Sequence, residues 1–575
     1  MSGAPDNSHR ILQYGPSAHA FTALRACLDS DFNPAQSLSR RRETDAELQD
    51  WPDDYRRALV ASDSLAQMMA SLSWPLVREL EVADTPEHDH HATVRFLAAA
   101  PEAGELRRIT LPEGLDDEDI TEIVRSPHLK ELQNISISVE GLSAGSFRML
   151  ATSALLKRLR KLSISFFPPA SADDLQKCRL LLGNRNLDNL RYVSLSFPPA
   201  DFIEDLNRFH PVHLDALRVQ VFSSDDGAFD QLCDAHSLLA GLTELILPSC
   251  ELTDSDVQRL MTCIGEGRLA SLSLSQNNLS ESGISHLLSF GSRHRLSELD
   301  LQLNPLGDKG WTRIAGLDAG RLRRLCLDRT KGGDAGLAAL ATAPFMNTLE
   351  HLDFNRNQIS PDGMDEFISS AKCDRLKTLS FDENPLANAG ASALSSSEWA
   401  HLKSLSLRDI GMDAAGLSAL FDGTALRSLT SFQLDGNDLH EAEFVESGEP
   451  LFPTGLQVLT LAGCNLGDGG IAALQRSDSY HALRVLRLGV NQIDDSELAN
   501  LARTPSLSKL WVLDLKHNPF GDAGLKKVLD GLSLNELHEL RLEGTSVTLN
   551  GLEYAKKKCP SLKILVHQSL PLWTR

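Results

Sequence analysis

One period of 26 or 27 residues recurs twelve times through the second half of the chain. Each copy begins with a pattern close to LxxLxL, such as LASLSL from residue 269 and LEHLDF from residue 349. The copies start at Leu242, Leu269, Leu296, Leu322, Leu349, Leu376, Leu402, Leu429, Leu456, Leu483, Leu510 and Leu537. A fixed period of this length is typical of a solenoid, in which each repeat packs against its neighbours. We therefore expect an array of repeats.

Each repeat has a strand half and a helix half. The LxL stretch alternates apolar and other residues at period two, as a half-buried strand does. An Asn at the ninth position can bond turning backbone that would otherwise be buried without partners. It occurs at Asn277, Asn304, Asn357, Asn384, Asn437, Asn491 and Asn518, while Cys250 and Cys464 replace it as small buried residues. Six aspartates stand where a helix N-cap is expected: Asp254, Asp308, Asp334, Asp468, Asp495 and Asp522.

The pattern LxxLxLxxNxL followed by a helical half resembles a leucine-rich repeat. Among such repeats it is most similar to the ribonuclease-inhibitor-like class, whose long repeats carry an α-helix and often a D-x-G before it. The resemblance implies an α/β leucine-rich-repeat solenoid, a horseshoe with a parallel concave sheet and outer helices. It also implies protein recognition through the concave sheet, which is what most members of this class do.

The spacing continues upstream in a weaker form. Seven further strands are predicted, centred on Leu80, Ile109, Ile135, Leu162, Val193, Leu217 and Leu565, which makes about 19 repeats. We expect residues 1–72 to form a helical or irregular N-terminal cap, 73–241 to hold divergent repeats, 242–567 to hold regular repeats and 568–575 to form a C-terminal tail. Caps are expected because the end repeats of a solenoid expose apolar surface.

Charge and composition exclude several classes of function. The chain has 56 Lys and Arg against 78 Asp and Glu, a formal net charge of −22. Phosphate binding needs clustered basic residues, so neither nucleic acid nor an anionic membrane is expected as a partner. No apolar run reaches the length of a membrane-spanning helix, and nine scattered cysteines without a CxxC pair favour reduced thiols. We expect a cytoplasmic monomer.

No motif in the sequence argues for catalysis. EHDHH at 87–91 is the densest set of metal-type ligands, but consecutive residues cannot all face one ion, and a solvated loop is the favoured interpretation over a metal site. GGDAG at 332–336 and GDGG at 467–470 lack the spacing of phosphate loops and fall at strand-to-helix turns. We therefore predict a non-enzymatic protein with no cofactor and no metal.

The concave face is the predicted binding surface, because residues between the strand leucines must point away from the core. At the fifth and seventh positions, an acidic stripe collects in the middle of the face: Asp300, Asp328, Asp353, Asp382 and Asp435, with Arg408 among them. Arg487, Lys516 and Arg541 gather toward the C-terminal end. Stacked like charges destabilise a sheet, which favours an acidic docking stripe for a basic partner over a merely solvated surface, although both interpretations stay open.

The function predicted from these residues is that of a non-catalytic protein-recognition scaffold whose partner has a basic surface. Two alternatives remain. One is a regulator of a partner enzyme, similar to the Ran GTPase activators that share this repeat type, although their functional loop residues have no match here. The other is a host-directed bacterial effector, since long arrays of this type occur in such proteins.

Overall fold

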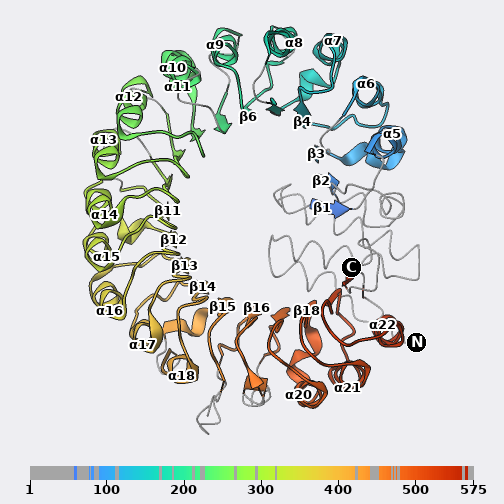
Figure 1. Cartoon of the computed structure of the whole chain (residues 1–575), viewed down its shortest axis with the longest axis vertical. Coiled ribbons are helices and arrows are strands. Elements are labelled where there is room, and N and C mark those ends of the chain that lie inside the picture. Colours follow the sequence, from blue (N-terminus) through green and yellow to red (C-terminus); the bar gives the residue numbers. More distant parts are fainter. Residues whose placement is uncertain are drawn as a thin grey trace. The chain divides into compact units, whose positions relative to one another are not determined.

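The protein is described by a computed structural model covering residues 57–60, 77, 79–82, 90–110, 115–167, 171–183, 187–209, 214–220, 227–264, 268–291, 296–317, 320–420, 425–440, 452–467, 470–471, 474, 480–559, 562 and 564–566. The chain divides into two compact units. Unit 1 comprises residues 1–251 and 259–269, and unit 2 comprises 252–258 and 270–575. In each unit, strands form a parallel sheet whose outer side is covered by helices (Figure 1). We call the sheet face turned away from the helices the inner face.

Unit 1 alternates strands with helices. Its strands are β1 (Arg57–Val60), β2 (Glu79–Val82), β3 (Arg108–Thr110), β4 (Asn134–Ser138), β5 (Lys161–Ser165), β6 (Tyr192–Ser196), β7 (Ala216–Gln220) and β8 (Glu244–Ile246). Its helices are α5 (His90–Ala99), α6 (Asp117–Arg125), α7 (Ala144–Thr152), α8 (Ala172–Leu182), α9 (Ala200–Phe209), α10 (Ala228–Asp234) and α11 (His236–Gly241). α12 (Asp254–Ile264) has residues in both units. Each strand from β1 to β7 pairs in parallel with the next one along the chain.

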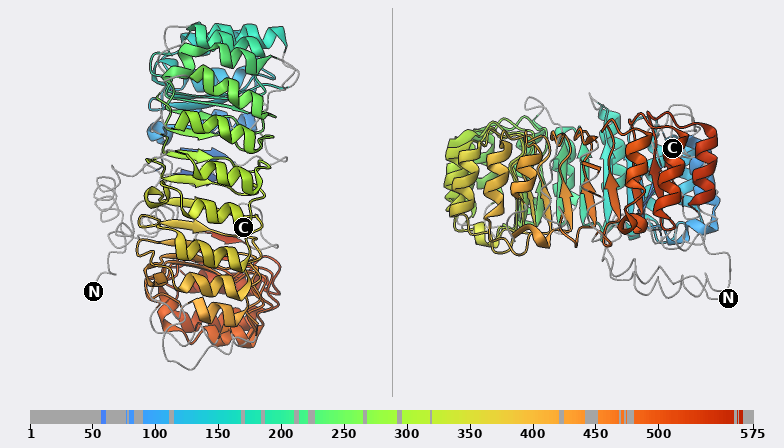
Figure 2. Two further views of the ribbon diagram at one scale, coloured as in Figure 1. Left: turned by 90° about the vertical axis from the view of Figure 1, so that its left-hand side faces the viewer. Right: turned by 90° about the horizontal axis from the view of Figure 1, so that it is seen from below.

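Unit 2 repeats the same arrangement with shorter strands. They are β9 (Ser271–Ser273), β10 (Glu298–Asp300), β11 (Arg324–Cys326), β12 (His351–Asp353), β13 (Thr378–Ser380), β14 (Ser404–Ser406), β15 (Ser431–Gln433), β16 (Val458–Thr460), β17 (Val485–Arg487), β18 (Val512–Asp514), β19 (Glu539–Arg541) and β20 (Ile564–Val566). The described helices are α13 (Glu281–Gly291), α14 (Gly307–Ala315), α15 (Asp334–Ala341), α16 (Pro361–Ser370), α17 (Ala387–Ser395), α18 (Ala414–Leu420), α20 (Asp495–Leu501), α21 (Asp522–Leu532) and α22 (Leu549–Lys558). Figure 2 shows helices of this unit stacked along its outer side.

The predicted α/β repeat solenoid is confirmed, and all nineteen predicted strands are present as β2 to β20. One strand was missed. β1 lies within residues 1–72, where a helical or irregular cap was expected, and pairs with β2 in register from Arg57 and Glu79. The rest of residues 1–72, and residues 568–575, lie outside the described residues. The boundaries expected at 72, 241 and 567 stay predictions.

The core of each repeat follows the alternation seen in the sequence. In β12, Leu352 is buried while His351 and Asp353 on either side of it are half-buried on the inner face. The flanking leucines Leu349 and Leu340, the latter from α15, are fully buried. Removing such leucines from water supplies about 25 cal/mol per Å² of apolar surface, so each helix is held mainly by packing on its sheet.

The ninth-position asparagines form the predicted backbone ladder. The Asn384 side-chain amide donates to the carbonyls of Phe354, 2.9 Å away in the preceding repeat, and Phe381, 3.0 Å away in its own. Its oxygen accepts from the Ile359 amide at 3.2 Å. The thiol of Cys464 donates to the Leu434 carbonyl at 3.2 Å, which accounts for the replacement. The repeat at residue 322 uses the hydroxyl of Thr330 at this position, which donates to Leu327.

The N-cap assignment of the aspartates was wrong in one respect: they cap the helix of the following repeat. Asp334 lies in the first turn of α15, and its carboxylate accepts from the amide and hydroxyl of Ser360, the N-cap residue of α16. Asp254, Asp308, Asp495 and Asp522 make the same forward contact, while Asp468 is outside the described residues. At these five helix starts an orphan amide is thereby satisfied by the repeat before it.

This forward cap explains the D-x-G spacing. A Cβ added to Gly363 would lie 2.1 Å from Oδ1 of Asp334, and one added to Gly551 would lie 2.2 Å from Oδ1 of Asp522. The glycine of one repeat therefore leaves room for the aspartate of the previous one. Gly332 in the GGDAG segment similarly faces the ring of Trp311, with the nearest ring atom 2.1 Å from an added Cβ. These glycines have structural roles.

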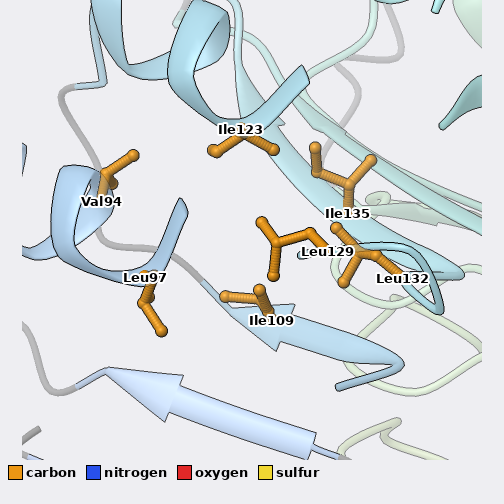
Figure 3. Close-up of a pocket in the computed structure, with 7 residues that line it drawn as sticks. All are labelled: Val94, Leu97, Ile109, Ile123, Leu129, Leu132 and Ile135. Carbon is orange, nitrogen blue, oxygen red and sulfur yellow. The ribbon is translucent and has the colours of Figure 1, made fainter. Parts of the chain in front are cut away.

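Unit 1 contains a small apolar cavity between α5, α6, β3 and β4 (Figure 3). Its volume is about 10 Å³, and aliphatic side chains such as Leu97, Ile109 and Ile135 line it. A space of about one water molecule without polar partners is a packing defect. The cysteines in the described residues are free, and burial raises the pKa of the Cys178, Cys373 and Cys464 thiols to about 12. None of the described helices has both the length and the apolarity needed to cross a membrane.

Candidate functional site

The fifth-position residues of unit 2 form one straight row on the inner face. Strand register places Asp300 beside Cys326 and Cys326 beside Asp353. The row continues through Ser380, Ser406, Gln433, Thr460, Arg487, Asp514 and Arg541. The structure therefore brings the predicted Asp300 and Asp353 to one row, with only Cys326 between them.

The seventh-position residues reach across to the next strand. The Asp382 carboxylate accepts from the hydroxyl of Ser406 at 2.6 Å and from the amide of Arg408 at 2.8 Å. Asp435 likewise accepts from the Ala462 amide at 2.7 Å and the Thr460 hydroxyl at 3.0 Å. These aspartates have a structural role, because each satisfies a backbone amide on the following repeat.

Asp328 lacks that partner. The amide that would complete the pattern belongs to Asn355, and it donates instead to Asp353 within its own repeat, at 3.0 Å. Oδ1 of Asp328 is consequently buried with no hydrogen-bond partner among the described residues. The carboxylates of Asp328 and Asp353 thus compete for the Asn355 amide. The free energy of the folded state rises because the Asp328 carboxylate is buried without this hydrogen bond.

Burial and crowding raise the pKa values of this group. Burial raises the pKa of Asp353 to about 6, and the charges of Asp328 and Asp382 add to the shift against the Asn355 hydrogen bond. Burial also raises the pKa of Asp328, opposed by Arg356, and that of Asp300, opposed by its bond from Ser273. The pKa of Asp382 is raised for the same reason. The middle of the inner face therefore holds carboxylates whose charged form is disfavoured.

The acidic stripe contains Arg356, a cation that the sequence prediction did not weigh, as well as the predicted Arg408. Arg356 lies 3.6 Å from Asp328 and 2.7 Å from Glu383, whereas Arg408 lies 3.4 Å from Asp435 and 3.9 Å from Asp382. Arg356 and Glu383 occupy the eighth position. Their positive φ values, 52° and 55°, recur at this position, which marks a turn that exposes the side chain. Tabulating the eighth position with the fifth and seventh would have found them.

The C-terminal basic group is interrupted by an acid. Arg487 and Arg541 belong to β17 and β19, and Asp514 of β18 lies between them in register. Asp514 is buried, and its carboxylate is 3.9 Å from Nζ of Lys516. Glu539 lies 2.5 Å from Arg541. The three predicted basic residues do share this end of the face, but acids pair two of them.

A shallow hollow of about 210 Å³ lies on the inner face over β11 to β15. Acidic and basic groups line it together with an imidazole: Arg324, Arg408, Asp353, Asp382 and His351. The hydroxyls of Thr378, Ser380, Ser404 and Ser406 complete the lining. Such a surface suits polar side chains of a partner rather than an apolar ligand.

One group outside this face has the right atoms for a metal. His91, Asp116 and Asp119 bring ligand atoms within 4.8 Å of one another. His91 belongs to α5, so the solvated loop expected for EHDHH does not hold there. Nδ1 of His91 is 2.7 Å from Oδ2 of Asp119, which also accepts from the Asp116 amide in the capping box of α6. These contacts link α5 to the start of α6.

One protein-family model supports the repeat assignment. The family model described as Leucine Rich repeat matches residues 294–315, 345–367, 454–474 and 506–529. No curated protein sequence matches the chain significantly. A chain of the yeast Rad7 and Elc1 complex is similar in structure, with 15% identity, a TM-score of 0.37, and coverage of 70% of this chain and 80% of the other. The TLR13–ssRNA13 complex gives 15% identity, a TM-score of 0.40, and coverage of 88% and 76%.

The fold is that of an α/β repeat solenoid built from parallel strands and outer helices. The four family matches lie on four separate repeats of unit 2, each of which carries the buried asparagine or its cysteine replacement. The chain is a leucine-rich repeat protein. Proteins of this kind generally act in protein–protein interaction.

Proposed function

We propose that the protein is a non-catalytic recognition scaffold that binds a partner with a basic surface on the inner face of unit 2. The observation that carries the proposal is the position of Asp353 in the row beside Asp328 and Asp382: burial raises its pKa to about 6, and the charges of these two neighbours add to the shift. A fold that needed only solvated polar residues would have no reason to stack carboxylates that disfavour one another. A cation from a partner would offset this cost.

The binding residues we propose are Asp300, Asp328, Asp353, Asp382 and Asp435, with Arg408 in the same stripe and Arg487, Lys516 and Arg541 at the C-terminal end. The hollow over β11 to β15 is the place where a partner side chain would enter. Because Asp300, Asp353, Asp382 and Asp435 are already held by hydrogen bonds, they would meet a partner with little loss of side-chain entropy.

We further propose that the repeats belong to the ribonuclease-inhibitor-like class, because periods of 26 or 27 residues carry an α-helix on the outer side. A net charge of −22 favours a monomer that avoids nucleic acid and anionic membranes. We place the protein in the cytoplasm because its described cysteines are free thiols.

The test is affinity capture from a lysate of the source, with identification by mass spectrometry. The wild-type chain is compared with Asp328→Arg/Asp353→Arg and with the isosteric Asp328→Asn/Asp353→Asn. A matched control, Asp365→Arg/Glu366→Arg, makes the same change of net charge on exposed residues of α16. We expect a basic protein that is retained by wild type and the control but lost from both stripe variants and at raised salt.

Equal retention by all four proteins would remove the stripe as the binding site. Circular dichroism of each variant separates loss of binding from loss of fold. A regulator of a partner enzyme would use the same face, and the identity of the captured protein would then reveal that enzyme.

A further inference from the structure

The inner face of unit 1 carries a block of serines. β4, β5 and β6 read NISIS, KLSIS and YVSLS, and their register aligns Ser136 with Ser163 and Ser194. Two residues further along, Ser138, Ser165 and Ser196 form a second row. All six are half-buried on the side opposite the buried Ile and Leu residues. We call these six residues the serine block.

The hydroxyls of the serine block have no hydrogen-bond partner among the residues that the structure describes. This differs from unit 2, where the equivalent hydroxyls are used internally. Ser273 donates to Asp300 at 2.8 Å, Ser380 to Asn355 at 2.5 Å and Ser406 to Asp382 at 2.6 Å. The serine block therefore offers six donors to whatever lies over it.

Basic side chains border the serine block. Lys161 precedes the serines on β5, and Arg218 continues the first serine row on β7, beside Ser194. The charged side chains described on the inner face of β4 to β7 are these two, and both are basic. The guanidinium of Arg218 is held by Gln220, whose Oε1 is 3.0 Å away.

Tyr192 is on β6, the strand between those that carry Lys161 and Arg218. Nζ of Lys161 lies 4.1 Å from the centre of the Tyr192 ring, a cation–π contact that fixes the ammonium above the sheet. Burial raises the pKa of Tyr192 and the charge of Glu244 on β8 adds to the shift, while the charges of Arg218 and Arg108 act in the opposite direction. Tyr192 thus keeps its proton and stands as a further hydroxyl donor between the two cations.

We propose that the serine block, with Lys161, Tyr192 and Arg218, is a second docking surface and that it binds an Asp/Glu-rich segment of a partner protein. Every group that these residues present is a cation or a hydroxyl donor, which is the complement of a carboxylate. The chemistry is opposite in sign to the acidic stripe of unit 2, so this inference does not depend on the function proposed above.

An acidic peptide fits this surface better than a nucleic acid does. Nucleic acid affinity comes from many phosphate contacts by clustered Lys and Arg, whereas Lys161 and Arg218 are two cations separated by hydroxyls. Carboxylates can pair with the two cations and accept hydrogen bonds from the intervening serines. The contact is polar, so its affinity should be modest and salt-dependent.

The experiment measures fluorescence anisotropy of a labelled sixteen-residue peptide of alternating Glu and Ser, titrated with the full chain. A salt concentration near 0.1 M is suitable, because the Debye length of about 10 Å screens the distant acids of a chain with a net charge of −22. We expect saturable binding by wild type, and none of a matched Gln/Ser peptide.

The main variant is Lys161→Glu/Arg218→Glu, which should weaken binding about tenfold or more. The control Arg148→Glu/Lys157→Glu makes the same change of net charge on exposed residues of unit 1 outside the sheet and should stay within about twofold of wild type. If the main variant fails to fold, Ser163→Ala/Ser194→Ala removes two hydroxyl donors at constant charge and should weaken binding several-fold.

Four results would overturn the proposal: no saturable binding by wild type, equal weakening by both charge-reversal pairs, equal binding of the Gln/Ser peptide, or tighter binding of a single-stranded DNA sixteen-mer. The Asp328→Asn/Asp353→Asn variant of unit 2 should bind the acidic peptide as wild type does. Loss of binding in that variant would also count against a separate surface.

Discussion

The carboxylate of Asp334 accepts hydrogen bonds from both the amide and the hydroxyl of Ser360, at 2.8 Å and 2.5 Å, although the two residues belong to successive repeats. Ser360 is the N-cap of α16, and its hydroxyl oxygen accepts from the Gly363 amide at 3.4 Å. The backbone amide of Ser360 at the same time donates to Asp334. The start of one helix is therefore fixed by the first turn of the helix before it.

Gly363→Ala should destabilise the fold by about 1–3 kcal/mol, because the new Cβ would overlap the Asp334 carboxylate and force it out of its capping position. Urea unfolding followed by circular dichroism measures the change. Gly320→Ala is the matched control, since an added Cβ there meets nothing within 4 Å. Asp334→Ala in the Gly363→Ala background should recover part of the lost free energy of unfolding. Equal destabilisation by Gly363→Ala and Gly320→Ala would contradict the close packing of Gly363 against Asp334.

Asp353→Asn should stabilise the protein at pH 7.5 by about 1–3 kcal/mol. The pKa of Asp353 is raised from 3.8 to about 6, so folding disfavours its charged form. The free-energy cost of burying the charged carboxylate is complete above pH 6 and decreases as the pH falls from 6 to 4. It is absent below the pKa of this group in the unfolded chain. Asn keeps the acceptor for the Asn355 amide. Thermal unfolding between pH 4 and pH 8 tests this, and an offset that is constant with pH would refute it.

Asn384→Ala should cost about 2–4 kcal/mol, because three backbone groups lose their buried partner. Asn384→Thr should cost less, since Thr330 fills the same position in another repeat and still donates to a carbonyl. Denaturant titration of both variants ranks them. A threonine variant as unstable as the alanine variant would mean that the ladder depends on the amide alone.

Cys326 should react slowly with iodoacetamide at pH 7.5. Burial and the charges of Asp300 and Asp353 raise the pKa of its thiol to about 11, and the thiolate is the reactive form. Asp353→Asn removes one of these charges and should accelerate alkylation by a few-fold, as measured by mass spectrometry of peptides. An unchanged rate in that variant would show that the charge of Asp353 does not control the reactivity of the thiol.

The sequence predicted the strands well because leucines at period two and asparagines at the ninth position leave few alternatives for a parallel repeat. It missed β1, since RALV lacks the flanking LxxLxL pattern. It placed Asp300 and Asp353 in one row correctly, as the constant period fixes register. It did not foresee Arg356 beside Asp328, because that pairing depends on a turn with positive φ at the eighth position.

The five described aspartate caps all act from one repeat on the next, whereas the ninth-position asparagines act on the repeat before. A chain shortened from its N-terminal side within these repeats would therefore leave the first remaining helix with an unsatisfied amide. A chain shortened from its C-terminal side would leave a backbone amide and a carbonyl of the last remaining repeat without their asparagine partner. Truncation at either end therefore exposes backbone polar groups, and a new end repeat needs polar side chains that replace whichever partner was removed.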